Sequence, residues 1–339
     1  MLPDVWVWFP SAGCATLLAA LVVVKEVDMA TPAILSLGNM LVEVMRVERD
    51  VALDIPGAFI GPFPSGDTPI YISTAARLGA ATGFIGALGA DEFGRCLLQR
   101  LQRDGVDCSA VAVLHDATTG VAFVAYFSDG SRRFIFHMRD AASGRLAPHM
   151  VPPAMLAGAR WLHITGVSLV MSESSRLACL RALELLPQGA RVSFDPNIRA
   201  DLSGVDATRA LCAPFLERAD LIVPSSGEAA MLTGAADDAD GCRTWAAAGK
   251  LVVLKRGAAG CRLFVANEEI DIAGFAADEV DPTGAGDSFC AGLTVGLLEG
   301  MPPVAACRFA NAVGALAVTV RGPMEGAPTR AAVEALLGR

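Results

Sequence analysis

Charged and aromatic side chains are scarce in this sequence, and acidic residues outnumber basic ones. Of the 339 residues, 19% are charged, 6% are aromatic and 53% are hydrophobic. Soluble domains usually carry about 25% charged residues, so the composition leans toward that of membrane proteins, and disorder and collagen-like architecture are excluded. The 27 basic and 36 acidic residues give a formal net charge of −9. This balance argues against a general binder of nucleic acid or of anionic membranes, because a phosphate surface requires a basic face.

Metal and disulfide patterns are also lacking. The nine cysteines are widely spaced and odd in number, no C-x-x-C pair occurs, and the four histidines are scattered. A zinc site or a disulfide framework is therefore not expected. The simpler interpretation is that the cysteines are reduced and pack as small hydrophobic residues, which predicts a cytoplasmic protein.

The longest uncharged run lies near the N-terminus. Residues 5–24 carry no charge and approach the length of a membrane span. A signal peptide is disfavoured because no basic residue precedes Lys25, and Pro10 and Gly13 interrupt the run. Met29, which runs directly into the first expected strand, is an alternative start of translation. We predict that residues 1–30 are an extension outside the fold, without stable membrane insertion; a membrane anchor is the lesser alternative.

The remaining chain, residues 31–339, reads as one α/β domain. Residues 33–37 form a short apolar run that ends at Gly38, as expected for a buried strand. After Gly144, apolar strands alternate with helical patterns, which predicts a central, mainly parallel sheet covered by helices on both faces. Residues 121–139 alternate on both sides of Asp129 and Gly130, which predicts a small β-hairpin flap.

The most informative motif is Asp-Pro-Thr-Gly-Ala-Gly-Asp-Ser-Phe at residues 281–289, directly before an apolar helix. The backbone N–H groups of its small residues would lie at the positive end of that helix and form an anion site. A carboxylate in the same turn makes sense if Asp287 accepts a proton from a hydroxyl that attacks a phosphoryl group held by these N–H groups. On the motif alone, an acidic residue that only favours the helix start is an equal alternative.

This motif resembles the C-terminal signature of the ribokinase-like (PfkB) carbohydrate kinases. Residues 83–94, 194–199, 253–260 and 310–316 resemble further elements of this family, in the family's order, and no Walker A sequence occurs. The resemblance extends from about residue 33 to the C-terminus. It implies a ribokinase-like three-layer sandwich with a flap, and ATP-dependent phosphorylation of a hydroxymethyl group on a small sugar or polyol.

The resemblance also implies roles for individual residues. Asp287 would be the base, and the N–H groups of the turn Gly284, Ala285 and Gly286 would stabilise charge on the transferring phosphoryl group. Glu228 would organise Mg²⁺ through water. Asp281 and Thr283 match positions that hold a monovalent cation such as K⁺ in the family, although solvated loop residues are nearly as good an interpretation. The further ATP-binding positions are Ser225, Lys255, Gly257, Gly260 and Asn311.

The sugar-binding half departs from the family pattern. Ser65 replaces the first glycine of a G-G-x-x-x-N element, Ile70 stands where a sugar-binding asparagine is expected, and Glu43 replaces an aspartate. Ser225 also replaces the asparagine of an N-x-x-E element. We therefore expect retained chemistry and an unusual substrate. The predicted substrate-binding residues are Asn39, Glu43, Ser65, Gly66, Asp67, Arg139, Asn197, Arg199 and Asp287.

Two arginines bear on the choice of substrate. The segment 136–143 is similar to the flap of 2-keto-3-deoxygluconate kinases, in which an arginine meets the sugar-acid carboxylate. If Arg139 and Arg199 converge on the cleft, a sugar acid is favoured. Otherwise Arg199 pairs with a neighbouring aspartate and Arg139 is solvated.

Four functions remain open. A ketohexose such as fructose or tagatose is the first hypothesis for the substrate, and 2-keto-3-deoxygluconate is the second. A nucleoside ranks third, because the N-terminal motif has no aromatic pair to stack a base. A non-catalytic nucleotide or sugar sensor is the fourth hypothesis, which the changes at Ser225 and Ile70 allow. A homodimer formed through the flap is also implied by the resemblance.

Overall fold

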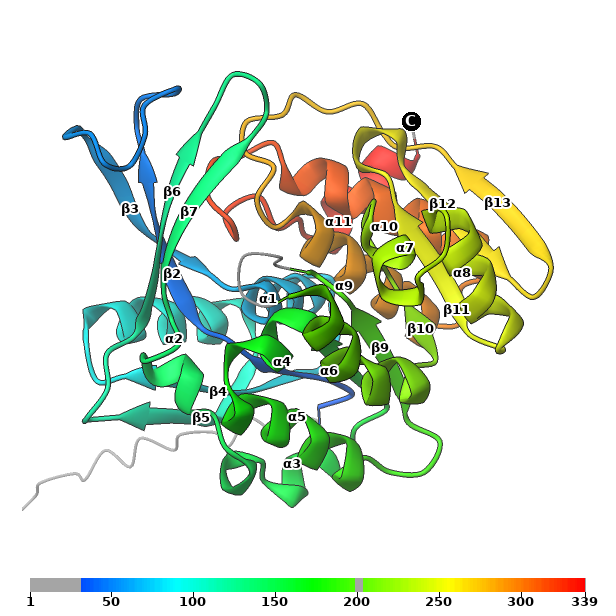
Figure 1. The fold of residues 1–339 in the computed structure, drawn as a ribbon, viewed down its shortest axis with the longest axis horizontal. Helices are drawn as coiled ribbons and strands as arrows, with labels where there is room; N and C mark the ends of the chain where they lie inside the picture. Colours follow the sequence, from blue (N-terminus) through cyan, green and yellow to red (C-terminus); the bar gives the residue numbers. More distant parts are fainter. Residues whose placement is uncertain (1–31, 199–203, 339) are drawn as a thin grey trace, which may run out of the picture.

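The computed structural model describes residues 32–198 and 204–338. The predicted extension, residues 1–30, and Arg199 lie outside the described residues. The described chain forms a large sheet between two layers of helices, with a smaller sheet projecting from one side (Figure 1). No helix among the described residues is long and apolar enough to cross a membrane.

The large sheet is mainly parallel, as predicted. All its neighbouring strands pair in parallel except at one edge, where β11, β12 and β13 pair antiparallel. Its strands, in spatial order, are β13 (Glu268–Ile272), β12 (Cys261–Val265), β11 (Leu251–Lys255), β10 (Leu221–Ile222), β9 (Arg191–Asp195), β8 (Trp161–Thr165), β1 (Ile34–Gly38), β4 (Thr82–Gly89) and β5 (Asp107–Leu114). Every residue of β1 and β4 is buried, because helices cover both faces of the sheet.

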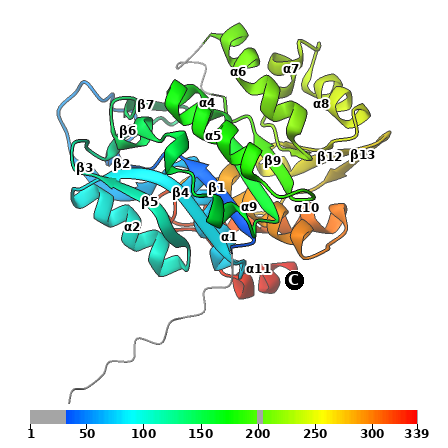
Figure 2. The ribbon, with the colours of Figure 1, turned by 90° about the horizontal axis from the view of Figure 1, so that it is seen from below.

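Helices cover the two faces of this sheet in two groups (Figure 2). The first group comprises α1 (Asp67–Arg77), α2 (Glu92–Asp104), α9 (Ala285–Leu298), α10 (Pro303–Ala317) and α11 (Arg330–Leu337). The second group comprises α3 (Pro153–Leu156), α4 (Gly166–Met171), α5 (Glu173–Leu185), α6 (Val205–Arg218), α7 (Glu228–Thr233) and α8 (Asp238–Ala247). The predicted three-layer α/β sandwich is therefore confirmed. The eight cysteines of the described residues are free, and six of them are buried, as the composition predicts.

The smaller sheet contains the predicted hairpin but is larger than predicted. Its strands, in spatial order, are β3 (Phe59–Ser65), β2 (Leu41–Arg46), β6 (Gly120–Tyr126) and β7 (Arg132–His137). Strands β6 and β7 are the hairpin, and Gly130 in its turn has a positive φ of 82°. Strand β2 pairs with β6 in parallel, so that a segment about 80 residues earlier in the chain completes the sheet. This four-stranded sheet is called the flap below.

The parallel order brings the carboxyl ends of β1, β9, β10 and β11 to one edge of the large sheet. Loops that follow parallel strands at such an edge are the usual place for a ligand site in this class of fold. The helix α9 also begins at this edge, and β7 of the flap lies over it.

Candidate active site

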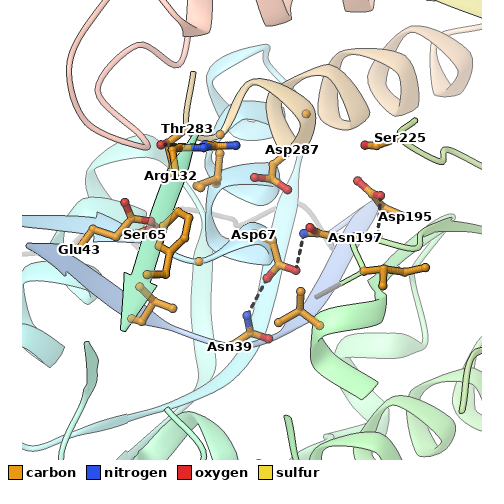
Figure 3. A pocket seen from close by; sticks show the side chains of 18 of the residues that line it. Asn39, Glu43, Ser65, Asp67, Arg132, Asp195, Asn197, Ser225, Thr283 and Asp287 are labelled. Atoms are coloured by element: carbon orange, nitrogen blue, oxygen red, sulfur yellow. Dashed lines mark hydrogen bonds between the residues drawn. The ribbon is translucent and has the colours of Figure 1, made fainter. Parts of the chain in front are cut away.

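A cavity of about 300 Å³ lies at this edge, between β7, the start of α1 and the start of α9. It brings together segments that are up to 250 residues apart in the chain (Figure 3). The predicted site residues that line it are Asn39, Glu43, Ser65, Gly66, Asp67, Asn197, Ser225, Glu228, Lys255, Thr283, Gly284, Gly286 and Asp287.

Asp67 is the centre of the polar network at the α1 side of the cavity. Its carboxylate accepts hydrogen bonds from Asn39 Nδ2 at 2.8 Å and from Asn197 Nδ2 at 3.1 Å. It also accepts a bond from the backbone N–H of Thr68 at 2.9 Å. Three predicted substrate-binding residues from three distant segments therefore form one hydrogen-bonded group. Gly66 precedes Asp67 with a φ of 111°, and a Cβ there would lie 2.3 Å from the backbone oxygen of Asn39, so only glycine allows this approach.

Glu43 and Ser65 form a second polar group, at the flap side of the cavity. Ser65 Oγ donates a hydrogen bond of 2.6 Å to Glu43 Oε1, and both side chains are buried. The two residues lie on the paired strands β2 and β3. The two residues that depart from the family pattern, Ser65 and Glu43, are thus hydrogen-bonded to each other.

The predicted anion turn has the geometry of a helix start with its N–H groups toward the cavity. Gly284 caps α9 with a φ of 81°, and a Cβ at this position would lie 2.4 Å from the backbone oxygen of Pro323. The first N–H groups of α9 lack partners within the helix and lie at the positive end of its dipole. Asp287 is the third residue of α9, and its carboxylate points into the cavity above Asp67 and Asn197 (Figure 3). A hydroxyl group bound at Asp67 would therefore lie between the two carboxylates.

A buried group of charges forms the β9–β11 side of the cavity. Lys255 Nζ donates a hydrogen bond of 2.5 Å to Asp195 Oδ2. Glu228 accepts bonds of 2.7 Å from the backbone N–H groups of Ser225 and Ile198. Burial, followed by the nearby Asp195 carboxylate, raises the pKa of Glu228 to about 7. Burial by itself would lower the pKa of Lys255, but the charge of the adjacent Asp195 carboxylate and its hydrogen bond to Lys255 outweigh burial and raise that pKa.

This group fits the predicted Mg²⁺. The two carboxylates of Asp195 and Glu228 face one ammonium group, that of Lys255, so one negative charge is left in excess and a divalent cation would offset it. Mg²⁺ keeps several of its waters, so Glu228 would hold it through water.

Asp281 and Thr283 do not have the arrangement of an open K⁺ site. Asp281 Oδ1 accepts bonds of 3.0 Å from Tyr126 Oη and from the backbone N–H of Thr283, and its Oδ2 accepts one from the N–H of Gly322 at 3.0 Å. Arg132 Nη1 lies 3.4 Å from Thr283 Oγ1 and supplies a positive charge there. These donors occupy both oxygens of the Asp281 carboxylate, and the charge of Arg132 disfavours a second cation beside Thr283, so the arrangement does not fit the predicted K⁺.

Arg139 does not reach the cavity. It lies beyond the end of β7 and is exposed. Alternate residues of a strand point to opposite faces, and the residues of this segment that line the cavity are Arg132, Phe134, Phe136 and Met138. The register of β7 therefore places Arg132, not Arg139, toward the ligand space.

Three of the predicted ATP-binding residues, Gly257, Gly260 and Asn311, do not line this cavity. Asn311 is buried, and its Nδ2 donates to the backbone oxygens of Ile272 and Ala273 at 3.1 and 3.0 Å. Its amide N–H groups thus hold the segment after β13 and do not point to a ligand. Gly257 and Gly260 lie in the turn between β11 and β12, outside the cavity, and a Cβ at Gly260 would lie 2.2 Å from the oxygen of Ile272. Ala285, the first residue of α9, does not line the cavity either.

Most of the apolar wall of the cavity was not predicted from the sequence. Phe134 and Phe136 stack with their ring centroids 5.2 Å apart, and Leu41, Val167 and Ile198 line the same space. The alternation of β7 was a usable signal for Phe134 and Phe136. Ile70 also lines the cavity, at the place where the resemblance implied an asparagine.

Known proteins that are similar to this chain over most of its length are carbohydrate kinases. The chain matches the model of the pfkB family carbohydrate kinases over residues 72–330. It is 33% identical to “Probable fructokinase-4” of Arabidopsis thaliana over 318 residues, which are 90% of this chain and 96% of that protein. A “putative Ribokinase II” from E. coli, solved with ATP and Mg²⁺, is 36% identical with a TM-score of 0.86 and covers 91% of this chain and 99% of its own. The fructokinase of Vibrio cholerae O395, solved with fructose, ADP and calcium, is 27% identical with a TM-score of 0.79 and covers 91% and 100%.

Proposed function

Because this chain belongs to the pfkB family of carbohydrate kinases and is a sugar kinase, we propose that it phosphorylates a hydroxymethyl group of a ketohexose, with fructose as the leading substrate. The observation that carries this proposal is the placement of Asp287 at the first turn of α9, facing the group of Asp67, Asn39 and Asn197 across the cavity (Figure 3). This arrangement provides a base, an anion site and a polar platform for a polyhydroxy substrate.

Asp287 acts as the general base. The sugar hydroxyl is held at Asp67, and its oxygen attacks the terminal phosphorus of ATP while the bond from that phosphorus to the bridging oxygen breaks. The hydroxyl proton passes to Asp287, and ADP leaves with the electron pair of the broken bond. The N–H groups at the start of α9 bind the equatorial oxygens of the phosphoryl group as their charge grows. Glu228, next to Asp195, would hold Mg²⁺ through water, and the cation would neutralise part of the charge of the ATP phosphates.

A ketohexose fits the two sides of the cavity. Asn39, Asp67 and Asn197 offer hydrogen-bond partners to hydroxyl groups, and the apolar wall around Phe134 and Phe136 can cover the C–H face of a sugar ring. The fructokinase relatives, with 30–33% identity, support the same substrate class.

A sugar acid such as 2-keto-3-deoxygluconate remains the second candidate. Arg139, on which that hypothesis rested, is exposed and does not line the cavity, and Arg199 lies outside the described residues. One observation still favours it: the guanidinium of Arg132 lines the cavity and could bind a carboxylate.

A sensor without catalytic activity is disfavoured, because the anion turn and Asp287 keep the arrangement that phosphoryl transfer requires. ADP release should be measured with fructose, tagatose, 2-keto-3-deoxygluconate, ribose and a nucleoside, with Mg²⁺ and ATP. Turnover that is highest with a ketohexose supports the proposal. If turnover is highest with the sugar acid, the second candidate substrate is supported instead. ATP binding without turnover of any of these substrates would favour the sensor.

We also propose that two copies of the chain associate through the outer face of the flap, and that the protein is cytoplasmic. Ile135 on β7 points away from the cavity and is 46% exposed, and it pairs in register with Phe123, which contacts the 41% exposed Phe59. An exposed apolar surface of this kind is typical of an interface. The reduced cysteines support the location. Light scattering coupled to size exclusion should give the mass of a dimer, and Ile135→Glu should give that of a monomer.

A further inference from the structure

Lys255, which the family resemblance places among the ATP-binding residues without a role in the reaction, is a buried cation in the cavity, and the mechanism above assigns it no step. It ends β11, its side chain is 11% exposed, and it lines the cavity. Its Nζ donates to Asp195 Oδ2 at 2.5 Å and lies 3.9 Å from Cys290 Sγ on α9. A cation that is held on two sides in this way has a defined position relative to α9.

That position is beside the anion turn. A Cβ built on Gly286 would lie 3.5 Å from Lys255 Nζ, so the ammonium group packs directly against the second residue of α9. Asp287 follows immediately, and Cys290 lies one turn further along the same helix. The ammonium group and the first N–H groups of α9 therefore point to the same part of the cavity.

A role limited to neutralising Asp195 does not account for this placement. An ammonium group has three N–H donors, and the hydrogen-bond partners found among the described residues are Asp195 and, at long range, Cys290. The ammonium group also borders the cavity, where a phosphate oxygen could accept a hydrogen bond from its remaining N–H.

We propose that Lys255 is a catalytic residue whose ammonium group, oriented by Asp195, binds the terminal phosphate of ATP beside the first turn of α9. This inference rests on the proposed kinase mechanism. As the bond from the sugar oxygen to phosphorus forms and the bond to the bridging oxygen breaks, Lys255 stays bonded to an equatorial oxygen and keeps its own proton. It thereby adds a point charge to the N–H groups that stabilise the transition state.

The first test needs no sugar. Equilibrium affinities for ATP and ADP, each with Mg²⁺, should be measured for the wild type, Lys255→Met and the control Lys250→Met. Lys250 directly precedes β11 at the opposite end of the strand, where its Nζ donates to the backbone oxygen of Glu217. For Lys255→Met, ATP should bind about tenfold more weakly and ADP less than about threefold more weakly, because only ATP has the terminal phosphate. Equal losses for both nucleotides, or no loss, would overturn the proposal.

The second test covers the case in which Lys255→Met leaves Asp195 unpaired and fails to fold. Asp195→Asn and the double variant Asp195→Asn/Lys255→Met bury no unpaired carboxylate at this position, and their turnover should be compared. If Lys255 binds phosphate, the double variant should be at least about tenfold slower than Asp195→Asn alone. If Lys255 only neutralises Asp195, the double variant should be as fast or faster, and the proposal fails.

The two tests also separate this inference from the proposed substrate. A wild type that binds ATP more tightly than ADP through Lys255 but phosphorylates no ketohexose would remove the ketohexose proposal and leave the inference intact. Normal ketohexose turnover in Lys255→Met would overturn the inference about Lys255 and leave the ketohexose proposal intact.

Discussion

Tyr126 Oη donates a hydrogen bond of 3.0 Å to Asp281 Oδ1, and this bond ties the flap to the loop that precedes α9. The same hydroxyl lies 2.9 Å from Thr283 Oγ1, two residues nearer to the anion turn. Because Tyr126 ends β6, the contact links the position of the flap to that of the turn proposed to bind phosphate.

Tyr126→Phe should therefore loosen this link without touching the reacting atoms. Loss of the hydroxyl leaves the buried Asp281 carboxylate with one donor fewer, which should lower the free energy of unfolding by about 1–3 kcal/mol. The KM for the sugar should rise several-fold while kcat changes less, because β7 of the flap lines the cavity in which the sugar is proposed to bind. Chemical denaturation and steady-state kinetics measure the two effects. An unchanged denaturation midpoint together with an unchanged KM would show that the bond does not hold the flap.

Asp287→Asn tests the base. The amide cannot accept the hydroxyl proton but keeps the size of the side chain, so kcat should fall by about 10²–10⁴-fold. The affinity for ATP should stay within a few-fold of the wild type, because the N–H groups of the turn remain. Single-turnover rates and ATP titrations check both points. A variant with near-wild-type turnover would mean that another group accepts the proton.

Arg132→Ala and Arg133→Ala form a matched pair on β7. Arg132 lines the cavity and approaches Thr283, whereas the guanidinium of Arg133 lies 4.8 Å from the Phe127 ring centroid and does not line the cavity. Arg132→Ala should lower kcat/KM about tenfold, and Arg133→Ala should lower it by less than about twofold. A larger loss with a sugar acid than with a ketohexose in Arg132→Ala would favour the second candidate substrate. Equal effects of the two substitutions would show that strand register does not decide which arginine acts.

Potassium should not be required. Since both oxygens of Asp281 already accept hydrogen bonds and Arg132 supplies a charge at Thr283, replacing K⁺ by Na⁺ at constant ionic strength should change kcat/KM by less than about twofold. Strong activation by K⁺ in this assay would contradict this prediction and support the cation site that the family resemblance implies.

His163 should make stability depend on pH. Its imidazole is buried, stacks on Tyr71 with ring centroids 3.8 Å apart, and lies 2.8 Å from Ser193 Oγ. Burial lowers the pKa of His163 from 6.5 to about 3. Between these pH values the unfolded chain binds a proton that the folded chain does not. The free energy of unfolding should therefore fall with decreasing pH below 6.5, by up to about 1.4 kcal/mol per pH unit from this residue.

Melting temperatures between pH 7.5 and 5 provide the measurement, with His163→Gln as the comparison because glutamine does not titrate. The variant should be less stable at neutral pH but should lose stability less steeply toward pH 5. Parallel curves for the two proteins would show that His163 does not cause the dependence.

Local features of the site were predictable from the sequence because they depend on neighbouring residues. The glycines at 284 and 286, followed by an apolar segment, lead to a helix whose first N–H groups have no partners within the helix. The Asp129–Gly130 turn predicts its hairpin for the same reason. The order of strands and helices follows from alternating patterns, which predict a parallel sheet and hence the edge at which its loops meet.

Distant contacts were not predictable in this way. Asn197 meets Asp67 across 130 residues, and only packing of β9 next to β8 and β1 brings them together. Whether Arg132 or Arg139 faces the ligand depends on the register of β7 against β6, because a shift of one residue exchanges the two faces of a strand. The side chain of Asn311, expected at the nucleotide, is used to hold a neighbouring backbone segment, and nothing in its local sequence indicates that partner.

The few charged residues of this sequence illustrate the same difference between local and distant contacts. By itself the sequence determined a buried parallel sheet, a glycine-rich helix start and a carboxylate in its first turn, since each arises from residues close together in the chain. The tertiary structure alone decided where the few charges act. It set Lys255 against Asp195 and Gly286 and brought Arg132 to Thr283, because electrostatic interactions depend on distance in space and not on separation along the chain.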